Sequence, residues 1–227
     1  MSFHHEGWGV LPDGQGQGVT GDIRGIHGGV LTLVRYSSAM VQALLKPLTE
    51  DEYLDAESSA SVRHEFVYGT AYAMAGGSAN HNRIAGNLFS RMLTAHGHAC
   101  QPFISDMKLR LETGGLYYYP DVMLVCDPHD DEQQFKTSPC LVAEVLSPST
   151  DSTDRREKWA AYQKLPSLRE YLLLSQDRPH IELYTRVNLR QWGLTVLEAN
   201  DTLALSCMPL VLPVQDLYQG VDFFKRA

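Results

Sequence analysis

Apolar and polar residues alternate in two patterns near the start of the predicted domain. Thr49 and Glu52 have the spacing of a helix capping box, so we expect a short helix from there to about residue 57. Residues 64–68 and 70–74 then alternate around a glycine and predict a β-hairpin. A longer helix is expected over residues 78–96, because one apolar stripe recurs every four residues, at Ile84, Leu88 and Met92.

The rest of the pattern predicts mainly strands. Residues 140–146 are apolar except for Glu144, as expected for a central strand buried on both faces. A helix over residues 152–163 and a short one over 213–218 complete the set. Further strands are expected at 100–104, 107–111, 117–126, 170–174, 181–184 and 191–197. This order predicts a mixed α/β fold, in which helices flank a mixed sheet.

The first 47 residues differ from the remainder. Residues 1–38 are Gly-rich at 14–18 and 25–29 and lack a sustained helical or strand period. We therefore expect residues 1–47 to be a poorly ordered extension and residues 48–227 to be the domain. An alternative is that translation from an upstream codon adds this segment, with Met40 as the true start.

Composition limits the classes of protein to which this chain can belong. Hydrophobic residues make up 44% of 227 residues, which is enough for a core and excludes a disordered chain. No run of about 18 apolar residues predicts a membrane span, and no secretory signal is recognisable, so we expect a cytoplasmic protein. The net charge of −8 argues against a simple nucleic-acid-binding module.

The four cysteines show no metal or thioredoxin spacing. Cys100, Cys126, Cys140 and Cys207 contain no C-x-x-C pair. Cys126 and Cys140 lie in apolar stretches, so we interpret them as small core residues of a protein in a reducing compartment.

Two acidic residues interrupt apolar strands. Asp121 precedes Val122-Met123-Leu124-Val125, and Glu144 lies within Leu141-Val142-Ala143-Glu144-Val145-Leu146. A buried carboxylate costs several kcal/mol unless it is paired, hydrogen-bonded or bound to metal. Mg²⁺ suits such a pair, because it favours one or two carboxylates with water and phosphate oxygens. The alternative is that each acid pairs with its own Arg or Lys, or faces water at a strand end.

Lys158 is the third candidate. It shares one face of the predicted helix with Asp154 and Tyr162, and that helix begins just after the Glu144 strand. Its amine could orient a water that attacks phosphorus or stabilise the charge that develops there. The alternative is an ordinary Asp154–Lys158 surface pair, worth about 0.3–0.5 kcal/mol.

An ordered set of short motifs resembles the Uma-two family of predicted restriction endonucleases, within the PD-(D/E)XK nuclease superfamily. The resemblance covers about residues 48–223. The motifs are Leu48-Thr49-x-x-Glu52-Tyr53-Leu54, Arg63-His64-Glu65-x-x-x-Gly69, Met74-Ala75-Gly76 with His81, Ser105-Asp106-Met107-Lys108, Tyr119-Pro120-Asp121-Val122, Glu144-Val145-Leu146-Ser147-Pro148-Ser149-Thr150, and Asp154-x-x-x-Lys158-x-x-x-Tyr162.

The resemblance implies a restriction-endonuclease-like core with Asp121 and Glu144 as metal-binding acids. The chain departs from the superfamily pattern at Leu146, where a lysine is expected, and the resemblance offers Lys158 as the replacement. It also implies Glu65 as a third metal ligand, against the alternative of a pair with Arg63. His81 and Tyr162 are candidate substrate-binding residues, although a lone helix histidine is more often a surface or packing residue.

Together with these residues, the resemblance predicts an endonuclease that uses Mg²⁺ or Mn²⁺ and acts on nucleic acid, with DNA as the expected substrate. A homodimer is expected, because duplex cleavage needs two sites. One alternative is a catalytically inactive binding or regulatory module on the same fold. The other is a metal hydrolase with a different substrate and His81 as an additional ligand.

Overall fold

The computed structural model describes residues 21–27, 30–36, 47–95 and 100–223, which divide into two units at Leu48 and Thr49. In the first unit, β1 (Gly21–His27) and β2 (Val30–Tyr36) form an antiparallel hairpin that the sequence pattern did not predict. Met40 and the glycine run at 14–18 lie outside the described residues.

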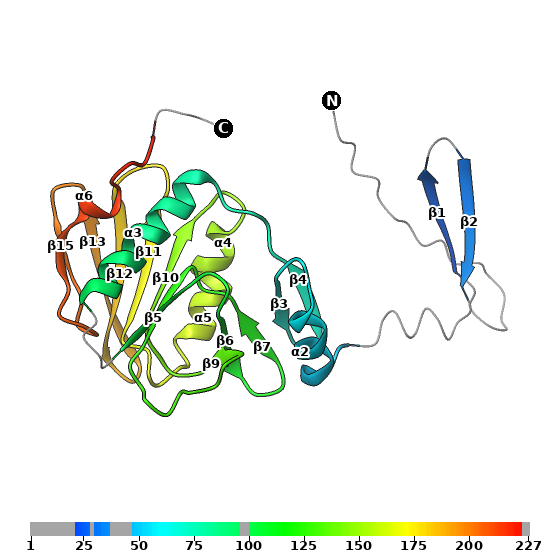
Figure 1. Ribbon diagram of the computed structural model, residues 1–227, viewed down its shortest axis with the longest axis horizontal. Helices are drawn as coiled ribbons and strands as arrows, with labels where there is room; N and C mark the ends of the chain where they lie inside the picture. The colour runs from blue at the N-terminus through cyan, green and yellow to red at the C-terminus, as the bar shows by residue number, and fades with distance from the viewer. Residues whose placement is uncertain (1–20, 28–29, 37–46, 96–99, 224–227) are drawn as a thin grey trace. The chain divides into compact units, whose positions relative to one another are not determined.

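The second unit is built on a six-stranded sheet with the order β13-β12-β11-β10-β8-β5 (Figure 1). β10 runs parallel to β11, and the other neighbours in this sheet are antiparallel. The strands span β5 (Gln101–Ile104), β8 (Val122–Val125), β10 (Pro139–Leu146), β11 (Glu170–Ser175), β12 (His180–Asn188) and β13 (Gln191–Glu198). The predicted mixed α/β architecture is confirmed.

Helices cover both faces of this sheet. On one face lie α3 (Ala79–Ala95), which buries the predicted stripe, and the short α6 (Val214–Leu217). The other face carries three consecutive helical segments: α4 (Asp151–Thr153), the π-helical turn η1 (Asp154–Lys158) and α5 (Trp159–Tyr162). None of the described helices has the length and apolarity that a membrane crossing requires.

β10 is the central strand, and its alternation places the site. All eight residues of β10 are buried. Leu141, Ala143 and Val145 pack in the core shared with α3, whereas Val142 and Leu146 pack in the core shared with α5. Because successive side chains of a strand point to opposite faces, Glu144 points to the α5 side.

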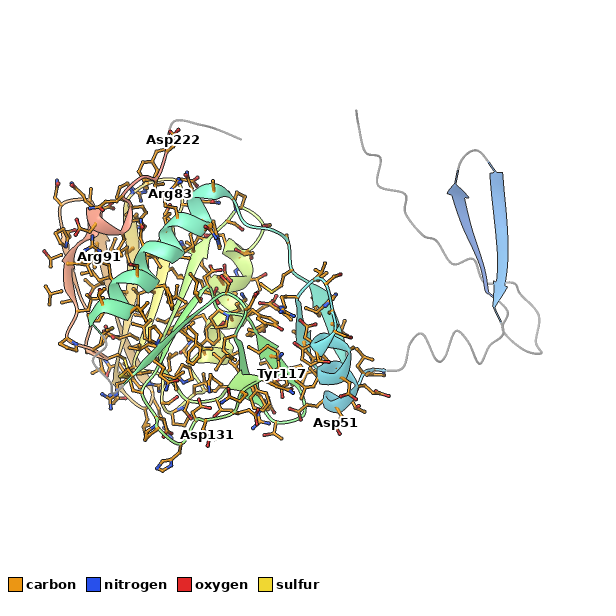
Figure 2. The ribbon with its side chains drawn as sticks, viewed as in Figure 1. Asp51, Arg83, Arg91, Tyr117, Asp131 and Asp222 are labelled. Atoms are coloured by element: carbon orange, nitrogen blue, oxygen red, sulfur yellow. A yellow bond between two sulfur atoms is a disulfide. The ribbon has the colours of Figure 1, made fainter. Side chains whose placement is uncertain are left out.

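A five-stranded sheet with the order β4-β3-β7-β6-β9 lies beside α2 (Glu50–Ser58) (Figure 1). The predicted capping box of α2 is present, with Thr49 and Glu52 bonded reciprocally. Tyr53 of α2 stacks on Phe66 and contacts Tyr117, which lies between this sheet and α2 (Figure 2). The strands span β3 (His64–Val67), β4 (Thr70–Ala73), β6 (Lys108–Glu112), β7 (Leu116–Tyr118) and β9 (Phe135–Lys136).

The predicted strand over residues 117–126 is wrong as one element. The segment forms β7 in the five-stranded sheet and β8 in the six-stranded sheet, separated by Tyr119, Pro120 and Asp121. Proline has no N–H to donate to a strand ladder, so the chain leaves one sheet there and enters the other. The break places Asp121 just before β8. The short pair β14 (Thr202–Ala204) and β15 (Val211–Pro213) was not predicted either.

The interpretation of Cys126 and Cys140 as small core residues of a protein in a reducing compartment missed their disulfide bonds. Cys100 is bonded to Cys126 and Cys140 to Cys207, and no cysteine of the described residues is free. Gln101 pairs with Val125 across β5 and β8, which brings the neighbouring Cys100 and Cys126 face to face. Disulfides persist mainly in oxidising compartments, so this pairing does not support the reducing compartment inferred from the sequence.

Candidate functional site

Asp121 and Glu144 lie side by side, and each carboxylate accepts a hydrogen bond from a backbone N–H of the neighbouring strand segment. The Asp121 carboxylate accepts a hydrogen bond from the Val145 N–H at 2.7 Å, through Oδ2. The Glu144 carboxylate accepts one from the Asp121 N–H at 3.3 Å, through Oε2. The antiparallel pairing of Val122 with Ala143 enforces this arrangement, because it places the residue before β8 opposite Glu144. The two acids that interrupt apolar strands therefore converge. Among the described residues neither pairs with an arginine, but Glu144 pairs with Lys158, so the alternative of a basic partner holds for that acid.

Lys158 links Glu144 to two further carboxylates, those of Glu65 and Asp154. Its Nζ lies 3.0 Å from Glu65 Oε1, 3.2 Å from Asp154 Oδ1 and 3.4 Å from Glu144 Oε1. The π-helical turn η1 carries both Asp154 and Lys158. Such turns widen the helix locally and occur often at functional sites.

Burial overturns the surface-pair alternative for Asp154 and Lys158. Their side chains are 2% and 7% exposed, so this is a buried ion pair rather than a solvated i,i+4 pair. Glu65 contacts Lys158 across the site, whereas Arg63 pairs with Asp106 at 3.7 Å. The alternative Arg63–Glu65 pair is therefore not what positions Glu65.

His81 and Tyr162 each contact one of the two central acids. Nε2 of His81, in the first turn of α3, lies 3.0 Å from Asp121 Oδ2. The hydroxyl of Tyr162 donates to Glu144 Oε1 at 2.8 Å. The Tyr162 side chain is fully buried, so its place in the structure is that of a support for Glu144, in contrast to the predicted contact with substrate.

Burial and mutual charge shift the pKa values of Glu144, Asp154 and Lys158. Burial raises the pKa of Glu144 well above its ordinary value, and Lys158 opposes this rise. Burial also raises the pKa of Asp154, again against Lys158. Burial alone lowers the pKa of Lys158, but Glu144, Glu65 and Asp154 outweigh it and the pKa lies well above its ordinary value. The lysine is therefore held in its charged form.

A cavity of about 480 Å³ is lined by six side chains of the site: Glu65, His81, Asp121, Glu144, Asp154 and Lys158. The sequence pattern did not single out Tyr72 and Gln176, which also line it, and treated Asp154 only as a partner of Lys158. Asp154 is buried at the start of the π-helical turn, and such a turn leaves no signal in the spacing of residues. The remaining wall is the loop of residues 73–78 and the loop of residues 147–150.

Comparison with known proteins identifies the family of this chain. A family model described as "Putative restriction endonuclease" matches residues 50–215, which is most of the chain and includes all six candidate site residues. The chain belongs to the Uma2 family. Two uncharacterized proteins of Synechocystis sp. are similar: slr1290 is 39% identical over 179 residues, covering 78% of this chain and 94% of the relative, and sll1609 is 42% identical over 163 residues, covering 70% and 92%.

A solved structure shares the fold. It is described as a "putative nuclease belonging to DUF820" from Anabaena variabilis, with a TM-score of 0.62 and 16% sequence identity over 76% of this chain and 98% of that chain. At that identity the likeness shows the fold alone. The restriction-endonuclease-like fold and the Uma2 membership inferred from the motifs are thereby confirmed.

This Uma2 chain has Leu146 at the position where the motif resemblance leads one to expect a lysine. The Leu146 side chain is buried in the core shared with α5 and cannot bind water or phosphate. Lys158 brings an ammonium group within 3.4 Å of Glu144 from the following helical segment. The Lys158 ammonium therefore lies in the site, although position 146 carries an aliphatic side chain.

The donor atoms fit a hard divalent cation held by few protein ligands. No group of three or more His, Cys, Asp and Glu side chains converges as a complete metal cage within the residues that the structure describes. Mg²⁺ needs no such cage, since it is commonly bound by one or two carboxylates with water and phosphate oxygens. Both described bonds of the Asp121 carboxylate use Oδ2 and none uses Oδ1, so one oxygen remains for a cation.

Proposed function

We propose that this chain is a divalent-metal-dependent endonuclease that hydrolyses phosphodiester bonds in nucleic acid, with DNA as the first substrate to test. The observation that carries the proposal is the convergence of Asp121 and Glu144 beside the Lys158 ammonium. Three carboxylates lie within 3.4 Å of the Lys158 ammonium and Asp121 adjoins one of them, Glu144, so further positive charge would stabilise the cluster. A divalent cation supplies it.

Asp121 and Glu144 would hold Mg²⁺ or Mn²⁺, with the Val145 carbonyl as a neighbouring oxygen ligand. A bound divalent ion lowers the pKa of a coordinated water and neutralises charge on the scissile phosphate. Glu65 is the candidate for a third carboxylate ligand, since Glu65 and Glu144 both contact the Lys158 amine.

The other groups prepare the site for this reaction. The Lys158 ammonium orients the attacking water or stabilises the charge that develops on phosphorus oxygens. Tyr162 fixes the rotamer of Glu144 through its hydrogen bond, and His81 does the same for Asp121. His81 is also exposed enough, at 19% of its side chain, to contact a substrate phosphate.

The test is cleavage of supercoiled plasmid and of RNA with Mg²⁺ or Mn²⁺. We expect the wild type to nick DNA, and Asp121→Asn, Glu144→Gln and Lys158→Met to lose activity by at least about 100-fold each. Asp216→Asn and Glu198→Gln are the matched controls, because these acids pair with Arg91 and His180 outside the site. Equal cleavage by all variants would reveal a contaminant or a different site.

A non-catalytic binding or regulatory module is the second candidate. It is favoured by two observations: the central acids are already engaged by Lys158 and His81, and the net charge is −8. This candidate predicts that the chain binds nucleic acid but does not cleave it with any metal. It also predicts that Glu144→Gln binds nucleic acid as well as the wild type does. A hydrolase of another substrate would instead lose metal binding in His81→Ala.

The proposal includes a homodimer, because two sites are needed to cut both strands of a duplex. Sedimentation equilibrium of the full chain should give a mass of two chains, each of 25.4 kDa. The cytoplasmic location expected from the sequence is tested by cell fractionation of the tagged full chain.

A further inference from the structure

The β3–β4 hairpin presents two different faces. In its register Glu65 pairs with Tyr72, and Phe66 pairs with Ala71. Residues that pair directly across an antiparallel ladder lie on the same face. Phe66 is fully buried and stacks on Tyr53 of α2, so its face is the packed one. Glu65 contacts Lys158, so the face shared by Glu65 and Tyr72 is the one that turns toward the site.

Tyr72 places an aromatic ring at the mouth of the site. The residue is 54% exposed, yet it lines the same cavity as Glu65, Asp121 and Lys158. Within the described residues its hydroxyl makes no hydrogen bond and its ring stacks on no other ring. The Tyr72 side chain therefore contributes little to the stability of the fold. A buried tyrosine ring would contribute more, through the burial of its apolar surface.

Tyr68, in the turn of the same hairpin, shows the contrast. It is 59% exposed, but its hydroxyl donates to Glu112 at 2.8 Å. Its ring also lies over Gly115, where an added Cβ would come within 2.8 Å of the ring. Tyr68 thus has a structural partner on each side and does not line the cavity.

The surroundings of Tyr72 leave its ring accessible. The adjoining rim consists of the small or flexible residues of the segment 73–77, all but one of them exposed. At Gly76, an added Cβ would meet nothing within 4 Å. A planar group entering the cavity can therefore approach the ring without displacing a side chain.

Charge shows why such a ring would matter for binding. Lys158 is the only Lys or Arg among the cavity-lining residues that the structure describes, and three carboxylates lie within 3.4 Å of its amine. Phosphate attraction by basic side chains is thus weak at the site itself. Stacking of bases on aromatic rings is an independent source of affinity that does not depend on sequence.

We propose that Tyr72 is a stacking platform for the base next to the scissile phosphate, and that the substrate is a nucleic acid with open bases: a single strand or an unpaired segment. The proposal rests on the endonuclease function proposed above. A base face is available to a tyrosine ring only where it is not already covered by its neighbours in a duplex. The same ring explains how an acidic chain can hold nucleic acid.

The experiment is equilibrium binding of a fluorescein-labelled single-stranded DNA to the full chain by anisotropy, with Ca²⁺ present and strand integrity checked on a gel. Tyr72→Ala should weaken the Kd by roughly 5- to 150-fold, the range for loss of one base–aromatic stack. Tyr72→Phe should stay within about twofold of the wild type, because stacking needs the ring and not the hydroxyl. Tyr68→Ala is the matched control and should also stay within about twofold.

Four outcomes would overturn the proposal: a Tyr72→Ala protein that binds like the wild type, a Tyr72→Phe protein that is as weak as Tyr72→Ala, an equal loss in Tyr68→Ala, or no binding by the wild type.

A blunt-ended duplex should bind more weakly than the single strand, and its binding should respond less to Tyr72→Ala. The plasmid assay is read separately. Binding through Tyr72 without any cleavage would support base stacking on Tyr72 but refute the nuclease, and with it the position of that base beside a scissile phosphate. Cleavage that is indifferent to Tyr72 would support the nuclease and refute the stacking.

Discussion

Lys158 is the residue on which the electrostatics of the site depend. Its ammonium lies within 3.4 Å of three carboxylates, in a place where its side chain is 7% exposed. Removing one partner of a buried ion pair leaves uncompensated charge, which costs more than the pair contributes. The lysine therefore has a structural role besides the chemical one proposed for it.

Substitution of Lys158 by Met should destabilise the metal-free protein at pH 7 by about 3–5 kcal/mol, because Glu65, Glu144 and Asp154 would face one another without a cation. Urea unfolding in the presence of EDTA measures this. Mn²⁺ should restore more stability to the variant than it adds to the wild type. Lys164→Met, at an exposed position beyond the same helix, is the control. Equal unfolding midpoints for Lys158→Met and the wild type would contradict the ion-pair account.

Single residues were the most predictable part of the site. Asp121 and Glu144 stand out in the sequence because a carboxylate inside an apolar strand demands a partner. Tyr162 was assigned to substrate because spacing reveals which face of a helix a residue shares, but not how deeply that face is buried. Tyr72 gave no signal, since its position at the cavity depends on its pairing with Glu65 in a hairpin.

At the scale of elements, the helical segments α4, η1 and α5 are fastened to the sheet by Arg155. Its guanidinium donates to Asp151 at 2.8 Å and to both oxygens of Glu182 on β12, at 2.8 and 2.7 Å. Burial tends to raise the pKa of Glu182, but the bonds and charge of Arg155 outweigh it and the pKa lies below its ordinary value. The pair thus orders the segment that carries Lys158.

The pH dependence of Glu182→Gln tests this fastening. A lowered pKa in the folded state means that the carboxylate contributes stability above its unfolded pKa, near 4.3, and loses it as the pH falls through the folded pKa. We expect the substitution to lower the free energy of unfolding by about 1 kcal/mol at pH 7 and by much less at pH 3. The value at pH 7 is small because Arg155 is partly exposed. Thermal unfolding at the two pH values measures it. A cost that does not change with pH would refute the charged pair.

Element boundaries were predicted well where local chemistry sets them. Thr49 caps α2 as its capping box indicates, and Ser78 accepts from the His81 N–H at the start of α3. The segment at 117–126 was misjudged because its aromatic and β-branched residues suit a strand in either sheet. The proline within it carried the needed information, and the switch between sheets depends on pairings distant in sequence.

At the scale of the whole second unit, two disulfides connect distant segments. Cys140 precedes Leu141 in β10 and is bonded to Cys207 in the loop between β14 and β15, 67 residues away, whereas Cys100 and Cys126 are separated by 26. The apolar setting of these cysteines predicted burial correctly for Cys140 but not the partner, because the connectivity depends on the fold. The pair β14–β15 was missed for the same reason.

Replacing both members of one pair measures the contribution of each link. Cys140→Ala with Cys207→Ala should lower the unfolding free energy by about 2–4 kcal/mol, and by somewhat more than Cys100→Ala with Cys126→Ala, because the longer loop restricts the unfolded chain more. Urea unfolding without reductant gives both values. Four titratable thiols in the native protein, purified without reductant, would contradict the pairing and favour a reducing compartment.

The central claim is that Asp121 and Glu144 share one cation. Titration of Mn²⁺ into the metal-free full chain, followed by calorimetry, tests this claim most directly. We predict one strong site per chain in the wild type and in Glu198→Gln, and its loss in Asp121→Asn and in Glu144→Gln. Binding of Mn²⁺ that is unchanged in both site variants, or absent from the wild type, would contradict the claim that these two acids form a metal centre.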